Sequence, residues 1–292
     1  MDFYLLDVFG NSKYSGNQLA VFLDFGKLAA EEMQKIAREV NFSETTFITA
    51  RDKANDGYPV RIFTPEEEIG FAGHPTLGTA YIIKQHLEGG RSGIVRLNLK
   101  AGQIPVTFAG ETLWMKQNQP QFGKCSTPDQ MDELLGLKAD DIDDRFPIQE
   151  VTTGLPFTII PLKNLKALRR ARINRERYQD FIMHSLAKGI LIFCPESYED
   201  HQDLSSRVFV DYLGIPEDPA TGSGMGCLAG YLVQHRMFGE GKLCMTIGQG
   251  YEIGRPSELM IKAEKQGDRY EIEVGGKVIE IAKGDWKIAD SR

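Results

Sequence analysis

The chain of 292 residues is 41% hydrophobic and 26% charged, the balance of an ordinary globular protein rather than a disordered one. Lysine and arginine total 34 against 41 for aspartate and glutamate, and the net charge of −7 argues against a nucleic-acid binder. No apolar run approaches the ~18 residues of a membrane span, and the first residues lack the basic region of a signal peptide. We therefore expect a cytoplasmic protein that binds neither membranes nor nucleic acids.

The first half of the chain alternates strand-like and helix-like patterns separated by turn-forming residues. In chain order we predict strands at 2–9 and 17–23, a helix at 28–40, strands at 44–50 and 59–63, a helix at 75–87, and strands near 93–100, 102–109 and 111–117. The helix at 28–40 is amphipathic and has one apolar face, formed by Met33, Ile36, Ala37 and Val40. The pattern is that of a mixed α/β fold.

The second half repeats this order of elements. We predict strands at 148–153 and 155–162, a helix at 174–187, strands at 189–194 and 206–211, a helix at 223–236, and strands near 242–247, 257–264, 269–274 and 277–282. Short matching segments occur in the same order in both halves: Gly16 with Gly154, Arg61 with Arg207, and Gly73 with Gly222. The separation between matched residues only grows along the chain, as a duplication followed by loop insertions would give. We therefore predict two pseudo-symmetric α/β domains that arose by internal duplication.

The domain boundary is expected where the sequence becomes polar and rich in turn-forming residues. We place the N-terminal domain at 1–120 and the C-terminal domain at 125–277, with a link near 118–130 (NQPQFGKCSTPDQ). The last strand region, 278–290, is a candidate to return to the first domain.

The two repeated helices, near 75–83 and 224–233, are apolar or small nearly all round. Each is therefore expected to be the buried central helix of a mostly antiparallel sheet that is rolled around it. Both begin with a glycine-containing turn, where Pro75 suits the first helical position and His74 or Ser223 lies at or near the N-cap. Since helix N-termini attract anions, two such starts facing one another across a cleft would hold a small carboxylate. The alternative is two ordinary capped core helices.

Three titratable residues are candidates for the chemistry. Asp218 precedes a proline that holds it extended, and His74 is a hydrogen-bond partner or proton donor near neutral pH. Glu44 lies where a helix gives way to a strand, and apolar surroundings in a cleft would raise its pKa and let it act as acid and base in turn. The alternatives are a loop carboxylate for Asp218, a cap for His74 and a solvated edge residue for Glu44.

Several common catalytic motifs are missing. The glycine-rich stretch 222–226 follows a proline-containing loop and lacks the GxGxxG spacing of a dinucleotide site. The five histidines show no metal-ligand spacing, and no GxSxG serine-hydrolase motif occurs. The four cysteines are scattered without CxxC spacing and are expected to be reduced thiols. We therefore expect no metal and no organic cofactor.

Five segments together resemble the phenazine-biosynthesis isomerase (PhzF-like) family, which shares the diaminopimelate epimerase fold. They are spread over most of the chain in family order: GNQLAVF (16–22), NFSETTFI (41–48), FTP (63–65), FAGHPTLGTA (71–80) and DPATGSG (218–224). The resemblance implies two pseudo-symmetric domains, each a sheet rolled around a central helix, with the active site between them. It also implies an enzyme that needs no cofactor and is commonly a homodimer.

Roles can be carried over by position. The resemblance implies that Glu44 is the general acid/base, which moves a proton between two carbons of a cyclohexadiene carboxylate. His74 and Asp218 match side chains that orient the amino and hydroxyl groups of the substrate. Four residues complete the candidate substrate-binding set. Three match the helix starts that bind the carboxylate, and the fourth is the asparagine of the first matching segment: Gly73, Gly222, Ser223 and Asn17.

One departure from the wider epimerase fold limits the chemistry. Diaminopimelate epimerase carries a cysteine before each of the two helix-start glycines, whereas this chain has Ala72 and Thr221. Cys227 lies one turn inside its helix and is expected to pack in the core. We therefore predict a glutamate-mediated isomerase of a small cyclic or unsaturated amino-acid-like carboxylate. The alternatives are an epimerase or racemase with a different second acid, or a non-catalytic homologue that binds a small carboxylate or a protein.

Overall fold

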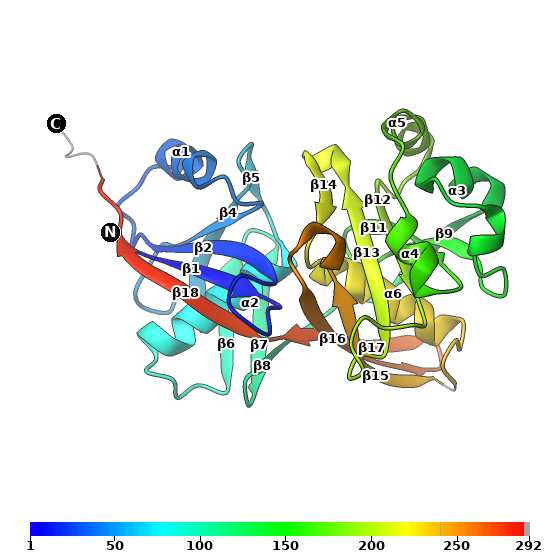
Figure 1. Cartoon of the computed structure of the whole chain (residues 1–292). Coiled ribbons are helices and arrows are strands. Elements are labelled where there is room, and N and C mark those ends of the chain that lie inside the picture. Colours follow the sequence, from blue (N-terminus) through cyan, green and yellow to red (C-terminus); the bar gives the residue numbers. More distant parts are fainter. Residues whose placement is uncertain (240, 289–292) are drawn as a thin grey trace. The chain divides into compact units, whose positions relative to one another are not determined.

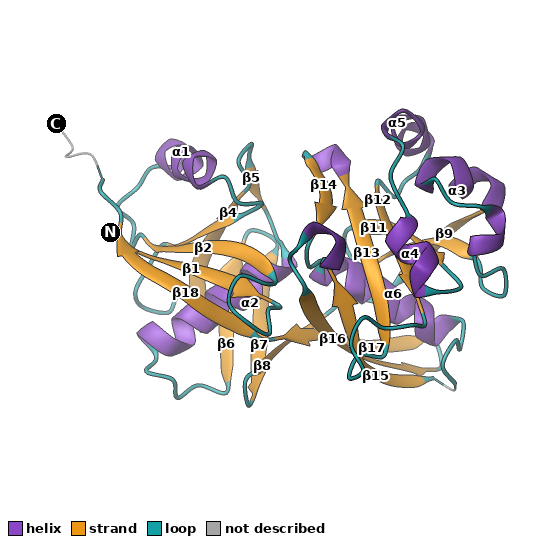
Figure 2. Ribbon diagram, viewed as in Figure 1, coloured by secondary structure: helices purple, strands orange, loops and turns teal. Residues whose placement is uncertain are grey.

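Two units make up the computed structural model, which describes residues 1–239 and 241–288 (Figures 1 and 2). The first unit contains residues 1–115 and the C-terminal segment from residue 275, and the second contains residues 116–274. Residues 289 and 290, at the end of the predicted 278–290 region, lie outside the described residues.

The first unit contains strands β1 to β8 and the last strand, β18. Its elements are β1 (Asp2–Val8), β2 (Asn17–Leu23), α1 (Ala30–Val40), β3 (Thr45–Ile48), β4 (Tyr58–Phe63), β5 (Glu68–Ile69), α2 (Gly73–Ile82) with a π-helical turn η1 (Ile83–Leu87), β6 (Ile94–Leu99), β7 (Gly102–Ala109), β8 (Thr112–Lys116) and β18 (Val278–Asp285). The pairs β18–β1, β1–β2, β3–β4, β4–β5, β6–β7 and β7–β8 are antiparallel, whereas β2–β3 and β4–β6 are parallel. The sheet is therefore mostly antiparallel, as predicted.

Helix α2 is the core of the first unit. Nine of its ten residues are buried, and it contacts β1, β2, β3, β6, β7 and β18. Contacts with so many strands require an apolar surface on every side of the helix, which explains the all-round apolar pattern of its sequence. By contrast α1 buries only one face, through Met33, Ile36 and Ala37, and packs against β3 and β4.

The second unit contains the remaining strands and four helices. Its elements are β9 (Gln121–Ser126), α3 (Pro128–Leu135), η2 (Ala139–Asp141), β10 (Ile148–Thr152), β11 (Pro156–Pro161), α4 (Leu165–Arg170), α5 (Arg175–His184), β12 (Gly189–Cys194), β13 (Leu204–Val210), η3 (Asp211–Leu213), β14 (Ile215–Asp218), α6 (Gly222–Gln234), β15 (Lys242–Gln249), η4 (Tyr251–Ile253), β16 (Ser257–Gln266) and β17 (Arg269–Gly276). Helix α6 is its central helix, with eleven of thirteen residues buried and contacts to β10, β11 and β16.

The strand pairings of the second unit repeat those of the first. The pairs β9–β10, β10–β11, β12–β13, β13–β14 and β15–β16 are antiparallel, whereas β11–β12 and β13–β15 are parallel. The parallel pairs occupy the same places in the succession as β2–β3 and β4–β6 do in the first unit. The predicted fold class, two units each with a mostly antiparallel sheet around a central helix, is confirmed. Descent from an internal duplication stays a prediction.

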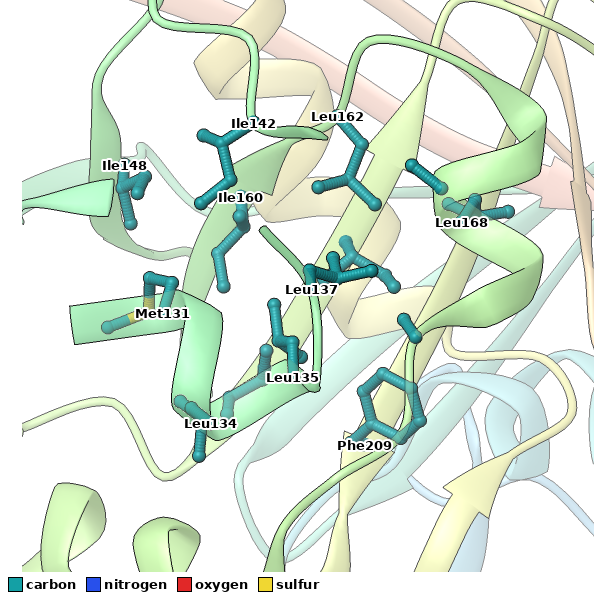
Figure 3. Close-up of a cluster of buried hydrophobic side chains, with 14 of the residues drawn as sticks. Met131, Leu134, Leu135, Leu137, Ile142, Ile148, Ile160, Leu162, Leu168 and Phe209 are labelled. Atoms are coloured by element: carbon teal, nitrogen blue, oxygen red, sulfur yellow. The ribbon is translucent and has the colours of Figure 1, made fainter. Parts of the chain in front are cut away.

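The outer helices of the second unit cover a separate apolar cluster (Figure 3). Leu134 and Leu135 of α3, Leu168 of α4 and Ile160 of β11 pack there with Phe209 of β13, and all are buried. The cluster fills the space between the sheet and helices α3 and α4. The predicted elements did not include α3 or α4.

Three details of the prediction are wrong. Residues 118–130 are not a link, because β9 lies within them and pairs with β10, and α3 begins at Pro128. Pro75 is the third residue of α2 and not the first, since the helix begins at Gly73. The very short strands β5 and β14 were missed. Within residues 1–239 and 241–288, no helix has the length and apolar character needed to cross a membrane.

The turn between β1 and β2 depends on Gly16, which has a positive φ of 70°. A Cβ there would lie 2.4 Å from the carbonyl oxygen of Val8 and 2.6 Å from the amide nitrogen of Gly10. We expect Gly16→Ala to lower the free energy of unfolding by at least about 1 kcal/mol more than Gly110→Ala. Gly110 also has a positive φ (63°), but a Cβ there would have no atom within 4 Å, so the control carries only the cost of the left-handed backbone. Equal losses in urea denaturation would contradict the close-approach argument.

Candidate active site

Glu44 lies in the short connection between α1 and β3. Helix α1 ends at Val40, and Asn41 takes the left-handed conformation (φ 56°) that turns the chain towards the sheet. The Glu44 side chain is only 17% exposed. Its Oε2 atom is buried and accepts no hydrogen bond from any residue that the structure describes. The solvated-edge alternative for Glu44 is therefore wrong.

His74 is the second residue of α2, and its side chain is 7% exposed. Its Nε2 atom lies 3.4 Å from Oε2 of Glu44, so the start of the central helix brings the imidazole to the carboxyl group. The N-cap is Ala72, whose side chain cannot accept a hydrogen bond from the first helical turn. His74 lies in the first turn of α2, at the positive end of the helix dipole.

Burial raises the pKa of Glu44 from 4.5 to about 7, because the charged carboxylate loses most of its hydration. The polar Ser43 side chain beside the carboxyl group lowers the pKa of Glu44 but does not cancel this rise. A carboxyl group with a pKa near 7 is populated in both protonation states at neutral pH. It can therefore accept a proton in one step and return it in the next.

This pKa has a measurable cost in stability. The folded protein binds the Glu44 proton more tightly than the unfolded chain does. The stabilisation from the protonated Glu44 side chain is therefore fully present below pH 4.5 and is lost as the pH rises through about 7. The full loss corresponds to about 3 kcal/mol. Glu44→Gln cannot titrate, so we expect it to become progressively more stable than the wild type between pH 5 and pH 8. Urea denaturation of both proteins across this range measures the difference, and parallel pH dependences would exclude the raised pKa.

Two further predicted residues lie in the same unit. Asn17, the first residue of β2, is 3% exposed, and its Oδ1 accepts a hydrogen bond from the Ser43 hydroxyl at 3.4 Å. Gly73 is the first residue of α2 and is buried. Asn17, Glu44 and His74 are thus gathered around Ser43 and the α2 start. Ser43 was not predicted as a site residue, although it lies within the matching NFSETTFI segment.

The other predicted residues gather at the start of α6 in the second unit. Asp218 ends β14 and is 8% exposed, and Gly222 and Ser223 are the first two residues of the helix. Thr221 is the N-cap, and its hydroxyl donates a hydrogen bond to Oδ2 of Asp218. The side chain of Asp218 is thereby tied to the helix start, within the same few residues as the predicted carboxylate-binding positions.

Cys227 has a structural role. Cys227 of α6 is fully buried, as predicted, and burial raises the pKa of its thiol to about 11. Its Sγ donates to the carbonyl oxygen of Leu155 at 3.5 Å. A thiol that is protonated at neutral pH and packed in the core is a poor base. In the described parts of the chain, no group of three or more His, Cys, Asp or Glu side chains is arranged to hold a metal ion.

Comparisons with known proteins identify the family of the chain. The family model described as "Phenazine biosynthesis-like protein" matches residues 6–284. A trans-2,3-dihydro-3-hydroxyanthranilate isomerase from Pseudomonas aeruginosa is 33% identical over 97% of this chain and 98% of its own length. The solved structure of a Bacillus anthracis phenazine biosynthesis protein of the PhzF family has a TM-score of 0.89, with 27% identity and 99% of both chains covered. That of a predicted epimerase from Pseudomonas aeruginosa has a TM-score of 0.80, with 31% identity and 99% of both chains covered.

The fold of two helix-centred units and the family match define an isomerase with an epimerase-like fold. The chain belongs to the phenazine biosynthesis-like (PhzF) family. The family resemblance of the five sequence segments and the prediction of an isomerase are confirmed.

Proposed function

We propose that the protein is a cofactor-independent isomerase that shifts a proton within a small cyclic or unsaturated amino-acid-like carboxylate. The observation that carries this proposal is the buried Glu44 carboxyl group, with a pKa of about 7 and Oε2 at 3.4 Å from His74. The first substrate to test is trans-2,3-dihydro-3-hydroxyanthranilate, which the name of the Pseudomonas aeruginosa relative specifies.

In this proposal Glu44 removes a proton from one ring carbon and returns it to another, while the double bonds move between them. The carboxylate becomes a carboxylic acid and then a carboxylate again, so atoms, electrons and charge balance within one molecule. Such a shift consumes no electrons and transfers no group, and it requires neither a metal nor an organic cofactor. Burial limits the access of water to Glu44, and any exchange of its proton with D₂O before the proton is returned would place deuterium on the ring.

The other residues bind and orient the substrate in this proposal. His74 and Asp218 hydrogen-bond its amino and hydroxyl groups. Backbone N–H groups at the two helix starts, from Gly73, Gly222 and Ser223, hold its carboxylate, since N-terminal N–H groups have no partner within the helix. Asn17, which is hydrogen-bonded to Ser43, completes the set.

The test is proton NMR of trans-2,3-dihydro-3-hydroxyanthranilate with the protein in D₂O. A shift of the double bonds, or deuterium at a ring carbon, with the wild type and not with Glu44→Gln would support the proposal. If the wild type leaves the compound unchanged, this substrate is wrong, and a panel of amino-acid carboxylates follows. Binding without exchange across that panel would favour a non-catalytic homologue. A cytoplasmic location and a homodimer stay predictions, and light scattering tests the latter.

An epimerase is the second candidate, because a relative with 31% identity is a predicted epimerase. Inversion at one carbon needs two acid/base groups on opposite faces of that carbon. The N-cap positions hold Ala72 and Thr221, and neither side chain can form a thiolate. Deuterium at a single α-carbon with inverted configuration would favour this candidate over a proton shift between two carbons.

A further inference from the structure

A buried glutamine holds both ends of the loop that precedes α6. Gln249, the last residue of β15, is fully buried. Its Nε2 donates to the carbonyl oxygen of Asp218 at 2.7 Å and to Oγ1 of Thr221 at 3.0 Å. Its Oε1 accepts the backbone N–H of Thr221 at 3.3 Å. One side chain from a distant strand is thus hydrogen-bonded to both the first and the last residue of the segment 218–221.

These partners set the direction of every hydrogen bond. A carbonyl oxygen can only accept and a backbone N–H can only donate, so the amide group of Gln249 has one possible orientation. The Thr221 hydroxyl therefore accepts from Gln249, and its single proton is donated to Oδ2 of Asp218. The result is a directed chain of donors, from Gln249 through Thr221 to the carboxylate of Asp218.

The residue after Gln249 holds the same loop through its backbone. Gly250 has a positive φ of 80°, and a Cβ there would lie 2.7 Å from the carbonyl oxygen of Pro219 and 2.4 Å from that of Arg255. Only glycine permits the turn to pass so close to Pro219. Gln249 and Gly250 therefore fix the side chains and the main chain of the loop from one side.

Among the residues that the structure describes, no such donor chain is found at the start of α2 in the first unit. The N-cap of α2 is Ala72, which has no hydroxyl group and makes no side-chain hydrogen bond to the helix. The donor chain therefore belongs to the helix start that carries a candidate substrate-binding carboxylate. Helix α2 is buried without a donor chain at its start, so burial of a helix does not require one. We therefore attribute the effect of the donor chain to Asp218.

We propose that Gln249 and Thr221 are positioning residues, which fix the orientation of the Asp218 carboxylate for substrate recognition. The inference rests on the proposed function, in which Asp218 hydrogen-bonds polar groups of the substrate. A carboxylate held in one rotamer by a directed donor binds without the entropy loss of ordering a mobile side chain.

The kinetic test compares variants of Thr221. Thr221→Val keeps the shape and removes the hydroxyl, and we expect it to lower kcat/KM by about tenfold or more, mainly through a higher KM. Thr221→Ser keeps the hydroxyl and should recover most of this loss. The matched control is Thr158→Val, because the Thr158 hydroxyl is also buried and makes no hydrogen bond within the described residues. A fall in kcat at constant KM, or equal effects of Thr221→Val and Thr221→Ser, would overturn the positioning role.

A second measurement tests the donor chain without turnover. Gln249→Met removes all three hydrogen bonds at similar volume, and we expect faster amide hydrogen exchange at Thr221 together with weaker binding of 3-hydroxyanthranilate in calorimetry. That compound carries the same carboxyl, amino and hydroxyl groups on an aromatic ring. Unchanged exchange, or faster exchange with unchanged binding, would overturn the inference.

If the wild type binds this probe but turns nothing over, the proposed reaction fails while the positioning role is still decided by binding. If the wild type neither turns over nor binds, both fail.

Discussion

Replacing Glu44 with glutamine is expected to lower kcat by about 10²–10⁴-fold, the contribution typical of a positioned general acid/base. The amide has nearly the shape of the protonated carboxyl group but cannot accept a proton. Binding of 3-hydroxyanthranilate should therefore persist, since the ground-state contacts of the site are kept. Steady-state kinetics and calorimetry on the same preparation separate the two effects, and a parallel loss of binding and turnover would contradict a role in proton transfer.

The matched control is Glu111→Gln, which removes the same charge from a side chain that is 83% exposed in the same unit. We expect it to leave kcat unchanged. The wild-type kcat/KM should fall on the acid side of about pH 7, because the base must be deprotonated and burial raises the pKa of Glu44 to about that value. An acid limb near pH 4.5 would mean that the reacting carboxyl group is exposed to water.

Replacing Arg207 with methionine is expected to destabilise the protein by about 3–5 kcal/mol, as breaking a buried ion pair on one side does. Arg207 is 3% exposed, and its guanidinium binds Glu217 through two hydrogen bonds of 2.9 and 2.7 Å. The same group donates to the carbonyl oxygens of Leu168 and Ala171, at the end of α4. Methionine would leave a buried carboxylate without its cation and two carbonyl groups without their donor.

The chain contains its own control for this variant. Arg61 makes the same two-fold contact with Glu68, at 2.8 and 2.7 Å, on the matching strands of the first unit. The side chains of that pair are 32% and 28% exposed, so Arg61→Met should cost only about 0–1 kcal/mol. Urea denaturation of both variants gives the comparison, and the double variant Arg207→Met/Glu217→Gln should recover part of the larger loss. Equal costs for Arg61→Met and Arg207→Met would show that burial of the pair is unimportant.

These matched arginines also illustrate what the sequence could predict. Each lies on a strand before a buried helix, in the similar segments RIF (61–63) and RVF (207–209), so the repeated order of elements could be read from the sequence. The two central helices could be predicted because a helix that is apolar on every side is expected to be buried. Glu44 and His74 were proposed from motifs, and the structure brings them to within 3.4 Å of each other.

The missed features lack a local signal. Strand β9 has largely exposed side chains and is recognisable only through its pairing with β10, more than twenty residues away. Helix α4 has six residues and β5 has two, lengths at which periodicity is not measurable. Gln249 reaches partners 28 and 31 residues distant, and an isolated glutamine at a strand end predicts no role.

The pairing of β18 with β1 has a consequence for how the protein is made. β18 pairs with the first strand along the full length of β1, from Asp2 opposite Asp285 to Val8 opposite Val278. On the ribosome β1 emerges before the second unit, whereas its partner β18 emerges only after the whole second unit. The nascent first unit therefore carries an open strand edge until the second unit has been synthesised, and such edges favour aggregation. Nascent chains stopped after residue 274 should be more sensitive to protease in the first unit than in the second, because the first unit begins before the second unit but is completed after it.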